Sequence, residues 1–286
     1  MATNTSRSMT RRAALRNAAR ATAVTGLAFT APAASAQSIY GKRRVTALAL
    51  TGDRYHNIDY VRTALGKTLV KDQGISIDFT DELSLLTAPN LKQYKLLIML
   101  RDGMTWPSGY EGPGGRPAVS EPPVAKFDQT PVYWMTVEQG KAVKEFVQNG
   151  GAALFYHNVT YISPQNQDFR DVLGAVTREH PPLRPFKVKI VNKEHPITRG
   201  VNDFVVTDEQ HFVKYEKEPK YVLMESVNED GLTWRDAGAS SVAGWAYDYG
   251  KGRVCYLAPG HVITALWNPE YEKIQKNAVR WLLREI

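Results

Sequence analysis

Three of the six histidines in this sequence fall where apolar runs typical of buried strands come to an end. They are His56, His157 and His261. Ligands of open α/β sheets bind outside the carboxyl ends of the strands, so we expect these imidazoles to share one rim of one sheet. Histidine transfers protons near neutral pH, which makes acid–base chemistry the first expectation for this rim. We interpret His157 as a base or a metal ligand, and not as a nucleophile.

A carboxylate and further polar side chains complete the candidate site. Glu209 lies in the polar stretch 208–211, between two pairs of apolar residues. We expect His157 or His261 to be the base, and Glu209 and His56 to orient or protonate the substrate. The candidate substrate-binding residues are Asp53, Arg54, Tyr55, Arg101, Asp102, Trp106, Tyr110, Asn158, His180, His195 and Asp208.

Some of these residues also have a plainer structural interpretation. His180 and His195 each precede a proline, so each is also explained by a turn in which the imidazole bonds to the backbone. Glu209 is also explained as a solvated loop carboxylate. A single histidine is more often structural than catalytic, and only the convergence of three at one rim makes the functional interpretation competitive.

Metal chemistry stays open on the sequence, whereas nucleophilic catalysis is disfavoured. A divalent transition metal would be held by His56, His157, His261 and Glu209, but neither H-x-H, HExxH nor a cysteine pair occurs to support it. Cys255 is the only cysteine, and it lies inside the apolar run V-C-Y-L, so we expect it in the core. The sequence also lacks a G-x-S-x-G elbow, a P-loop and a G-x-G-x-x-G motif.

The elements that must position these side chains alternate between strands and helices in the first half of the chain. Asn57 and Thr136 each fit the cap of an amphipathic helix, and Gly150-Gly151 fits the end of the second of these helices. We predict strands at 44–50, 75–79, 94–100, 152–156, 186–191, 221–226, 242–247 and 253–257, and a last helix at 269–284. This order predicts an α/β fold with a doubly wound, mostly parallel sheet flanked by helices, and additional strands in the C-terminal half.

The N-terminal residues account for most of the net charge of +7. Residues 1–36 contain five arginines and no acidic residue, and without them the 36 basic residues fall to 31 against 29 acidic ones, so no nucleic-acid partner is expected. Arg11-Arg12, an apolar stretch and Ala34-Ser35-Ala36 together predict a twin-arginine-type signal peptide and a periplasmic or secreted protein. A disordered basic tail is the other interpretation.

The remaining chain is expected to form one domain without a membrane span. We predict a short linker at 37–43 and the domain at 44–286. The long segment 101–135 is rich in glycine, proline and aromatic residues, and we expect it to form a lid-like loop.

From about Val45 to Trp281 the sequence resembles the trehalose-utilisation (ThuA-like) family, of the class I glutamine-amidotransferase-like superfamily. The motifs that carry the resemblance are Thr51-Gly52, His56-Asn57, Gly150-Gly151-Ala-Ala-Leu-Phe-Tyr-His157, His180-Pro181-Pro182, Glu194-His195-Pro196-Ile197-Thr198-Arg199-Gly200, Thr207-Asp208-Glu209, Tyr249-Gly250-Lys251-Gly252-Arg253-Val254 and Gly260-His261. The resemblance implies a flavodoxin-like fold. In amidotransferases the nucleophilic cysteine follows the strand that here leads to His157, so glutamine hydrolysis by a thiolate is not expected.

The resemblance also implies a role in carbohydrate catabolism, in a family often found beside oxidoreductases that make 3-keto-glycosides. It points to an exported protein that acts on keto-sugars by histidine and carboxylate chemistry, through elimination, hydrolysis or isomerisation. Trp106 and Tyr110 would stack on the sugar, and a sugar-oxidising oxidoreductase would be a partner. A non-catalytic carbohydrate-binding accessory protein and a metal-dependent hydrolase are the two alternatives.

Overall fold

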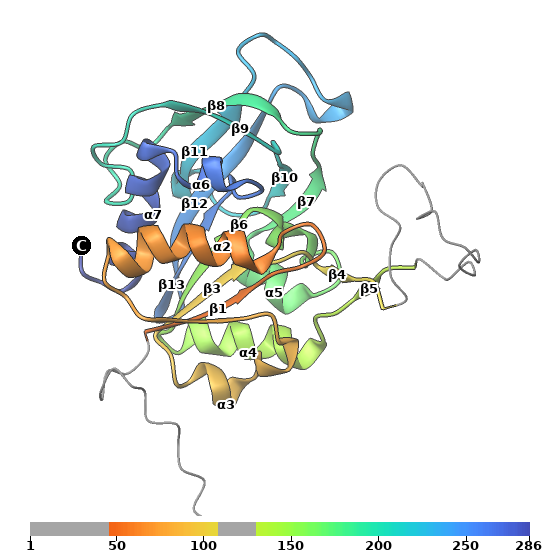
Figure 1. Ribbon diagram of the computed structural model, residues 1–286, viewed down its shortest axis with the longest axis vertical. Helices are drawn as coiled ribbons and strands as arrows, with labels where there is room; N and C mark the ends of the chain where they lie inside the picture. Colours follow the sequence, from red (N-terminus) through yellow and green to blue (C-terminus); the bar gives the residue numbers. More distant parts are fainter. Residues whose placement is uncertain (1–45, 108–129) are drawn as a thin grey trace, which may run out of the picture. The chain divides into compact units, whose positions relative to one another are not determined.

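The computed structural model describes residues 46–107 and 130–286, and a sheet of nine strands lies at its centre (Figure 1). The strands follow the order β2-β1-β3-β6-β13-β12-β11-β8-β9. Their bounds are β1 Ala47–Thr51, β2 Ile77–Thr80, β3 Leu96–Leu100, β6 Ala152–Tyr156, β8 Arg184–Ile190, β9 Phe204–Asp208, β11 Val222–Val227, β12 Ser240–Tyr249 and β13 Gly252–Leu257. All eight predicted strands are confirmed, and the sequence analysis missed β9.

The half of the sheet formed by β2, β1, β3, β6 and β13 is parallel. Every residue of β1, β3 and β6 is buried, as expected for parallel strands covered by helices on both faces. The chain winds from β1 outward to β2 and then to β3 on the other side of β1. The winding therefore reverses between β1 and β3, and such a switch point opens a crevice at the carboxyl ends of the strands.

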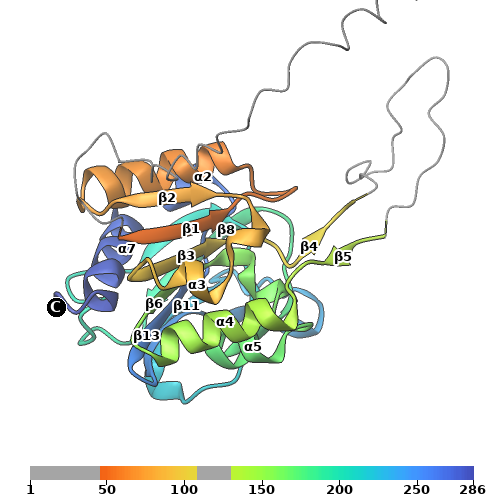
Figure 2. The same ribbon diagram turned by 90° about the horizontal axis from the view of Figure 1, so that it is seen from below.

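Helices cover the two faces of this parallel half. Right-handed crossovers place the helix after β1 and the helix after β3 on opposite faces, because the two connections run in opposite directions. Accordingly, α2 (Ile58–Leu65) lies on one face, and α4 (Val137–Gln148), packed on α5 (Gln167–Leu173), lies on the other (Figure 2). The remaining helices are α3 Ala88–Leu91, α6 Ile263–Leu266 and α7 Pro269–Leu282.

The expected helix caps are present. Asn57 accepts a hydrogen bond from the N–H of Asp59 at 2.7 Å and so caps α2. Thr136 and Gln139 form the reciprocal capping box of α4. The predicted last helix corresponds to α7, which begins with a proline at its first position.

The other half of the sheet is antiparallel from β13 through β12, β11 and β8 to β9. Each pairing reverses the strand direction, and four reversals separate β13 from β9. Both strands therefore end at the same edge of the sheet, although they lie far apart in the strand order. This geometry brings the carboxyl end of β9, where Asp208 and Glu209 lie, to the rim that carries the histidines.

Two short ribbons lie outside the main sheet. β7 (Ala175–Glu179) pairs with β10 (Phe212–Tyr215), and β4 (Met104–Thr105) pairs with β5 (Val132–Tyr133), both antiparallel. The β4–β5 ribbon forms the two ends of the segment for which we expected a lid. Residues 108–129, and Tyr110 with them, lie outside the described part of the chain. Within the described part, no helix is both long enough and apolar enough to cross a membrane.

Candidate active site

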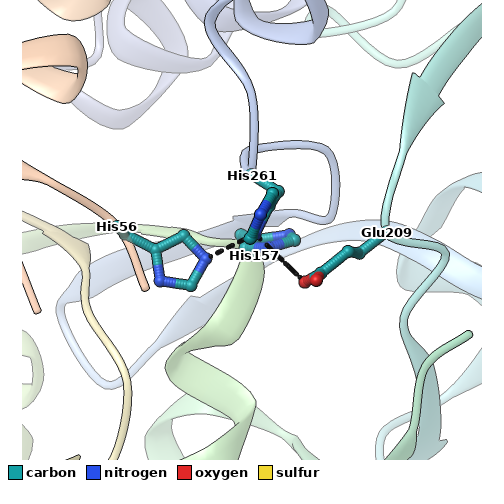
Figure 3. A group of neighbouring side chains, drawn as sticks. All are labelled: His56, His157, Glu209 and His261. Atoms are coloured by element: carbon teal, nitrogen blue, oxygen red, sulfur yellow. Dashed lines mark hydrogen bonds and ion pairs between the residues drawn. The ribbon is translucent and has the colours of Figure 1, made fainter. Parts of the chain in front are cut away.

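Four side chains from four separate segments meet at the carboxyl-terminal rim of the sheet (Figure 3). Oε2 of Glu209 lies 3.2 Å from Nδ1 of His261 and 3.4 Å from Nε2 of His157. Nε2 of His56 lies 3.1 Å from Nδ1 of His261. The structure thus brings together the three histidines and the glutamate that the sequence analysis selected.

The segment after β1 positions His56 through a buried carboxylate. Asp53 accepts backbone N–H groups from Tyr55 at 2.7 Å and from Asp102 at 2.7 Å, and its Oδ1 lies 2.9 Å from Nδ1 of His56. The amide of Asn158 donates a further hydrogen bond to Asp53 at 3.0 Å. Burial alone would raise the pKa of Asp53, but the hydrogen bond from His56 and those from the two backbone N–H groups outweigh it and lower the pKa to about 2.

His157 occupies a sharp turn at the end of β6. Its φ is +51°, a left-handed conformation that is uncommon for a residue other than glycine. Its Nδ1 lies 2.9 Å from the carbonyl oxygen of Ala258, which can only accept, so Nδ1 carries the proton and Nε2 is left with its lone pair. A Cβ on Gly260 would come within 2.7 Å of the Cβ of His157, so this position requires glycine. Burial lowers the pKa of His157.

Asp208 fixes the turn that carries His261. The buried carboxylate accepts the backbone N–H groups of Gly260 at 2.9 Å and of His261 at 3.1 Å, and also that of Glu209 at 2.7 Å. The end of β9 is thereby joined to the end of β13. Asp208 does not contact the centre of the cluster in this arrangement, and its role here is to position its neighbours.

Two more histidines lie against Glu209. Nδ1 of His180 and Nε2 of His211 are each 3.6 Å from Oε2 of Glu209, and the two rings stack with centroids 4.9 Å apart. Five of the six histidines of the chain therefore surround one carboxylate. His211 is not among the predicted site residues, although its place two residues after Glu209 in the polar stretch 208–211 was a usable signal.

The charges in the cluster follow from burial and from Glu209. Burial would raise the pKa of Glu209, but the imidazoles of His157, His211 and His261 beside its carboxylate hold the pKa well below its usual range. Burial lowers the pKa of His211 far below its ordinary value. For His261 burial acts in the same direction, but contact with Glu209 outweighs it and raises the pKa. The cluster therefore combines an ionised carboxylate with buried neutral imidazoles.

Arg101 and Asp102, at the end of β3, support the loops around the cluster. The buried guanidinium of Arg101 donates hydrogen bonds to the carbonyl oxygens of Gly52 and Asp81. Asp102 accepts the N–H of Met104 at 2.9 Å. Burial, and then the charge of Asp53, raise the pKa of Asp102 to about 7.

A polar hollow adjoins the cluster through Asp53. Its volume is about 430 Å³, within the range of small-molecule sites. Its walls include Asp53, Arg54, Asn57, Asp81, Arg101 and Trp106. A larger hollow of about 540 Å³ lies at the opposite edge of the sheet, by Lys95 and Gly151, and none of the clustered histidines lines it. Tyr55 lies beside the cluster with its side chain partly exposed.

The prediction that His195 binds substrate is wrong. Its Nδ1 accepts the N–H of Ile197 at 3.2 Å, and its ring packs on Trp281 with centroids 5.3 Å apart. The carbonyl of Trp281 accepts a hydrogen bond from Arg253, which lies at the amino end of β13. His195 therefore lies at the edge of the sheet opposite the cluster, where its imidazole bonds to the backbone of a turn. Cys255 is fully buried in β13, as expected.

Two groups among the described residues have donor atoms close enough to share a metal ion. One consists of His56, His157, Glu209 and His261, and the other of His180, Glu209 and His211. In each group the donor atoms lie within 4.8 Å of one another. Imidazole and carboxylate are suitable ligands for divalent transition metals.

Comparison with known proteins identifies both family and fold. The sequence profile of the family described as trehalose utilisation, ThuA, matches residues 44–282. None of the curated proteins compared with the chain matches it. A solved ThuA-like protein from Bacteroides uniformis is similar in structure, with a TM-score of 0.58 and 20% identity over 85% of this chain and 93% of its own. A ThuA-like protein from Parabacteroides merdae has a TM-score of 0.61 and 15% identity over 84% and 90%. At these identities the likeness supports the fold alone.

Proposed function

The chain belongs to the trehalose-utilisation family, ThuA, and we propose that it is an enzyme of carbohydrate catabolism that acts on keto-sugars or 3-keto-glycosides at the histidine–glutamate cluster. The family points to carbohydrate catabolism. The chemistry on a keto-sugar is our own proposal, and the composition of the cluster together with the exposure of its side chains supports it.

The observation that carries this proposal is the unequal exposure of the cluster. The side chains of His180, His261 and Glu209 are 30%, 21% and 15% exposed, whereas those of His157, His211 and His56 are between 0% and 3% exposed. A substrate can therefore touch only the first three. His157 is too deeply buried to remove a proton from a sugar, so the base must be sought on the open side.

His180 is the residue of the open side best suited to proton transfer. Its Nδ1 lies 3.0 Å from the carbonyl oxygen of Pro181, so Nδ1 carries the proton and Nε2 is left as the basic atom. The ring is held by stacking on His211. An imidazole that is partly exposed and fixed in one tautomer can act as a general base.

A 3-keto-glycoside has an acidic proton at C2, next to its carbonyl. In the proposed reaction His180 accepts this proton, and the electron pair of the C2–H bond forms the C1–C2 double bond. The C1–O bond breaks, and the leaving oxygen takes its electron pair and is protonated. The products are a keto-glycal and the free aglycone, and no nucleophile is required.

The polar hollow beside the cluster suits the rest of a sugar substrate. Its carboxylate, amide and guanidinium groups can exchange hydrogen bonds with hydroxyl groups, and the indole of Trp106 offers an apolar face for a sugar ring. Arg101 contributes to this wall of the hollow, where its Nη1 donates to the carbonyl oxygens of Gly52 and Asp81 and so holds their loops together.

The test is to incubate the purified protein with 3-keto-trehalose and a panel of 3-keto-glucosides, with and without divalent metals. We expect release of the aglycone, and loss of release in the His180→Asn variant. Binding without turnover across the panel would overturn the enzymatic proposal and make the protein a carbohydrate-binding accessory protein.

We also propose that the protein is exported through its twin-arginine-type signal, residues 1–36. These residues lie outside the described part of the chain, so the proposal rests on the sequence pattern. The chemistry of a 3-keto-glycoside requires a prior oxidation of the C3 hydroxyl. A sugar-oxidising oxidoreductase is therefore the partner enzyme that must supply the substrate.

A further inference from the structure

We infer that Nε2 of His56, Nε2 of His157, Nδ1 of His261 and the carboxylate of Glu209 together bind one divalent first-row transition-metal ion. The inference stands on the geometry of these four side chains. It rests on the proposed function only where it places a sugar beside the ion.

His157 and Glu209 place two hydrogen-bond acceptors close together. The hydrogen bond from Nδ1 of His157 to Ala258 leaves the lone pair of Nε2 directed toward the carboxylate, with Nε2 3.4 Å from Oε2 of Glu209. Two acceptor atoms at this distance repel each other unless a cation lies between them. Nε2 accordingly has no hydrogen-bond partner among the described residues.

His56 is held in the same way, by a hydrogen bond from its Nδ1. The carboxylate of Asp53 accepts a hydrogen bond from the Nδ1–H group, so Nε2 of His56 carries a lone pair and lies 3.1 Å from Nδ1 of His261. A remote hydrogen bond to a carboxylate or a backbone carbonyl is the usual way in which proteins fix the tautomer of metal-binding histidines. His56 uses the carboxylate and His157 uses the carbonyl.

The distances fit an ion of this class. Zinc and its neighbours bind nitrogen and oxygen at about 2.0–2.2 Å, which places tetrahedral ligand atoms roughly 3.3–3.6 Å apart. The three contacts that link the four donor atoms measure 3.1, 3.2 and 3.4 Å. Three imidazoles and one carboxylate suit zinc, iron, cobalt, nickel or manganese better than calcium or magnesium, which prefer all-oxygen sites.

The second group of possible ligands is less suitable. Nδ1 of His180 lies 3.0 Å from the carbonyl oxygen of Pro181 but 3.6 Å from Glu209, so its proton belongs to the hydrogen bond with Pro181. This leaves only His211 and Glu209, which are too few to hold an ion tightly. The geometry therefore predicts one ion per chain, with His180 beside it and not bound to it.

The open side of the ion faces the residues that a substrate can reach. His261 and Glu209 are partly exposed, whereas His56 and His157 close the inner side. An ion there would polarise a ketone oxygen of the substrate and so make the neighbouring C–H proton more acidic. His180 would then accept that proton.

Metal binding can be tested without any sugar. The purified full-length chain is freed of metal with a chelator and titrated with Zn²⁺ and with Co²⁺, by calorimetry and by visible absorption of the cobalt form. We expect one ion per chain. His56→Ala and His157→Ala should each weaken binding by more than about 100-fold, because loss of a ligand costs more than loss of its hydrogen-bond partner.

His180→Ala and His195→Asn are the matched controls. The metal affinity of both should lie within about threefold of that of the wild type, because neither change removes one of the four ligands. Unfolding of the metal-free variants by circular dichroism identifies any that fail to fold, and Glu209→Gln supplies a second variant of nearly unchanged shape. The inference is overturned if no ion binds stoichiometrically, or if His180→Ala weakens binding as much as His157→Ala. An ion that binds without keto-glycoside turnover contradicts only the proposed function, and turnover by metal-free protein contradicts only the role of the ion in polarising the ketone.

Discussion

Asp53 and His56 form the hydrogen bond that orients the cluster, with Oδ1 of Asp53 2.9 Å from Nδ1 of His56. The carboxylate is itself held by backbone N–H groups from two loops, so it cannot turn away from the ring. Nε2 of His56 is therefore directed toward His261 and Glu209. The switch point between β1 and β3 supplies both loops, and in this way the fold determines the tautomer of a single imidazole.

Replacing Asp53 tests this relationship. We expect Asp53→Asn to weaken metal binding by about 10- to 100-fold, as is usual when the hydrogen-bond partner of a metal-binding histidine is removed. The measurement is the same calorimetric titration. Asp248→Asn is the control, because Asp248 is exposed and bonds to Arg253 at the amino end of β13. Equal affinity in Asp53→Asn and the wild type would show that the tautomer of His56 does not depend on this carboxylate.

His180→Asn separates proton transfer from the binding of the ion. We expect turnover of a 3-keto-glucoside to fall by roughly 10²- to 10⁴-fold, the usual contribution of a general base. Metal affinity and the free energy of unfolding should stay close to those of the wild type. His195→Asn changes the one histidine outside the cluster and should leave turnover unchanged. A wild-type rate in His180→Asn would move the base to another residue.

Gly260→Ala tests the close approach of the two turns. The added Cβ would lie 2.7 Å from the Cβ of His157, so one of the turns must shift. We expect a loss of about 1–3 kcal/mol in the free energy of unfolding, measured in urea, together with weaker metal binding. The control is Gly66→Ala, where nothing lies within 4 Å of the added atom and the backbone is helical. That change should be neutral or stabilising by up to about 1 kcal/mol.

Asp102 gives the stability a specific pH dependence. Burial and the charge of Asp53 raise its pKa from 3.8 to about 7. Between these two values the unfolded chain releases the proton while the folded chain keeps it, so the stability of the wild type falls as the pH rises. The side chain at position 102 does not titrate in Asp102→Asn. We therefore expect the free energy of unfolding of this variant, relative to that of the wild type, to increase from about pH 4 to about pH 7, by at most roughly 4 kcal/mol. Urea unfolding of both proteins across this range is the measurement, and a constant difference would contradict the raised pKa.

The export proposal makes a separate prediction. Replacing the arginine pair, Arg11→Lys with Arg12→Lys, should retain the precursor inside the cell, because the twin-arginine route reads this pair. The control, Arg7→Lys with Arg20→Lys, makes the same two charge-conserving changes outside the pair and should leave export intact. Cell fractionation with detection of the protein decides between the two. Equal export of both variants would favour a route that does not recognise the pair.

The fold was largely predictable because local signals in the sequence agree with the tertiary structure. The continuous apolar runs of β1, β3 and β6 predict buried parallel strands, and the caps at Asn57 and Thr136 locate the helices between them. β9 was missed because it alternates between buried and exposed residues over only five positions, in F-V-V-T-D. Its pairing with β8 depends on tertiary contacts that no local pattern reports.

The candidate site was predictable in part, for a similar reason. The rule that ligands bind at the carboxyl ends of parallel strands selected His56, His157 and His261 correctly as neighbours. Glu209 and His211 reach the same rim through the antiparallel half of the sheet. In that half, the edge at which a strand ends depends on how many antiparallel pairings separate it from the parallel strands, and the sequence does not report this number. The motif around His195 looked equally functional in the sequence, but its turn lies at the opposite edge. Which histidines are too buried to touch a substrate follows only from packing.

Solvent-deuterium exchange at the carbon beside a ketone tests the central claim most directly. The substrate is 1,5-anhydroglucitol oxidised at C3, which has the acidic proton at C2 but no aglycone at C1. We predict that the metal-loaded protein in D₂O accelerates exchange of the C2 proton, observed by proton NMR, and that His180→Asn abolishes the acceleration while His195→Asn retains it. Exchange no faster than in protein-free buffer, with the keto-sugar shown to bind, would contradict the account.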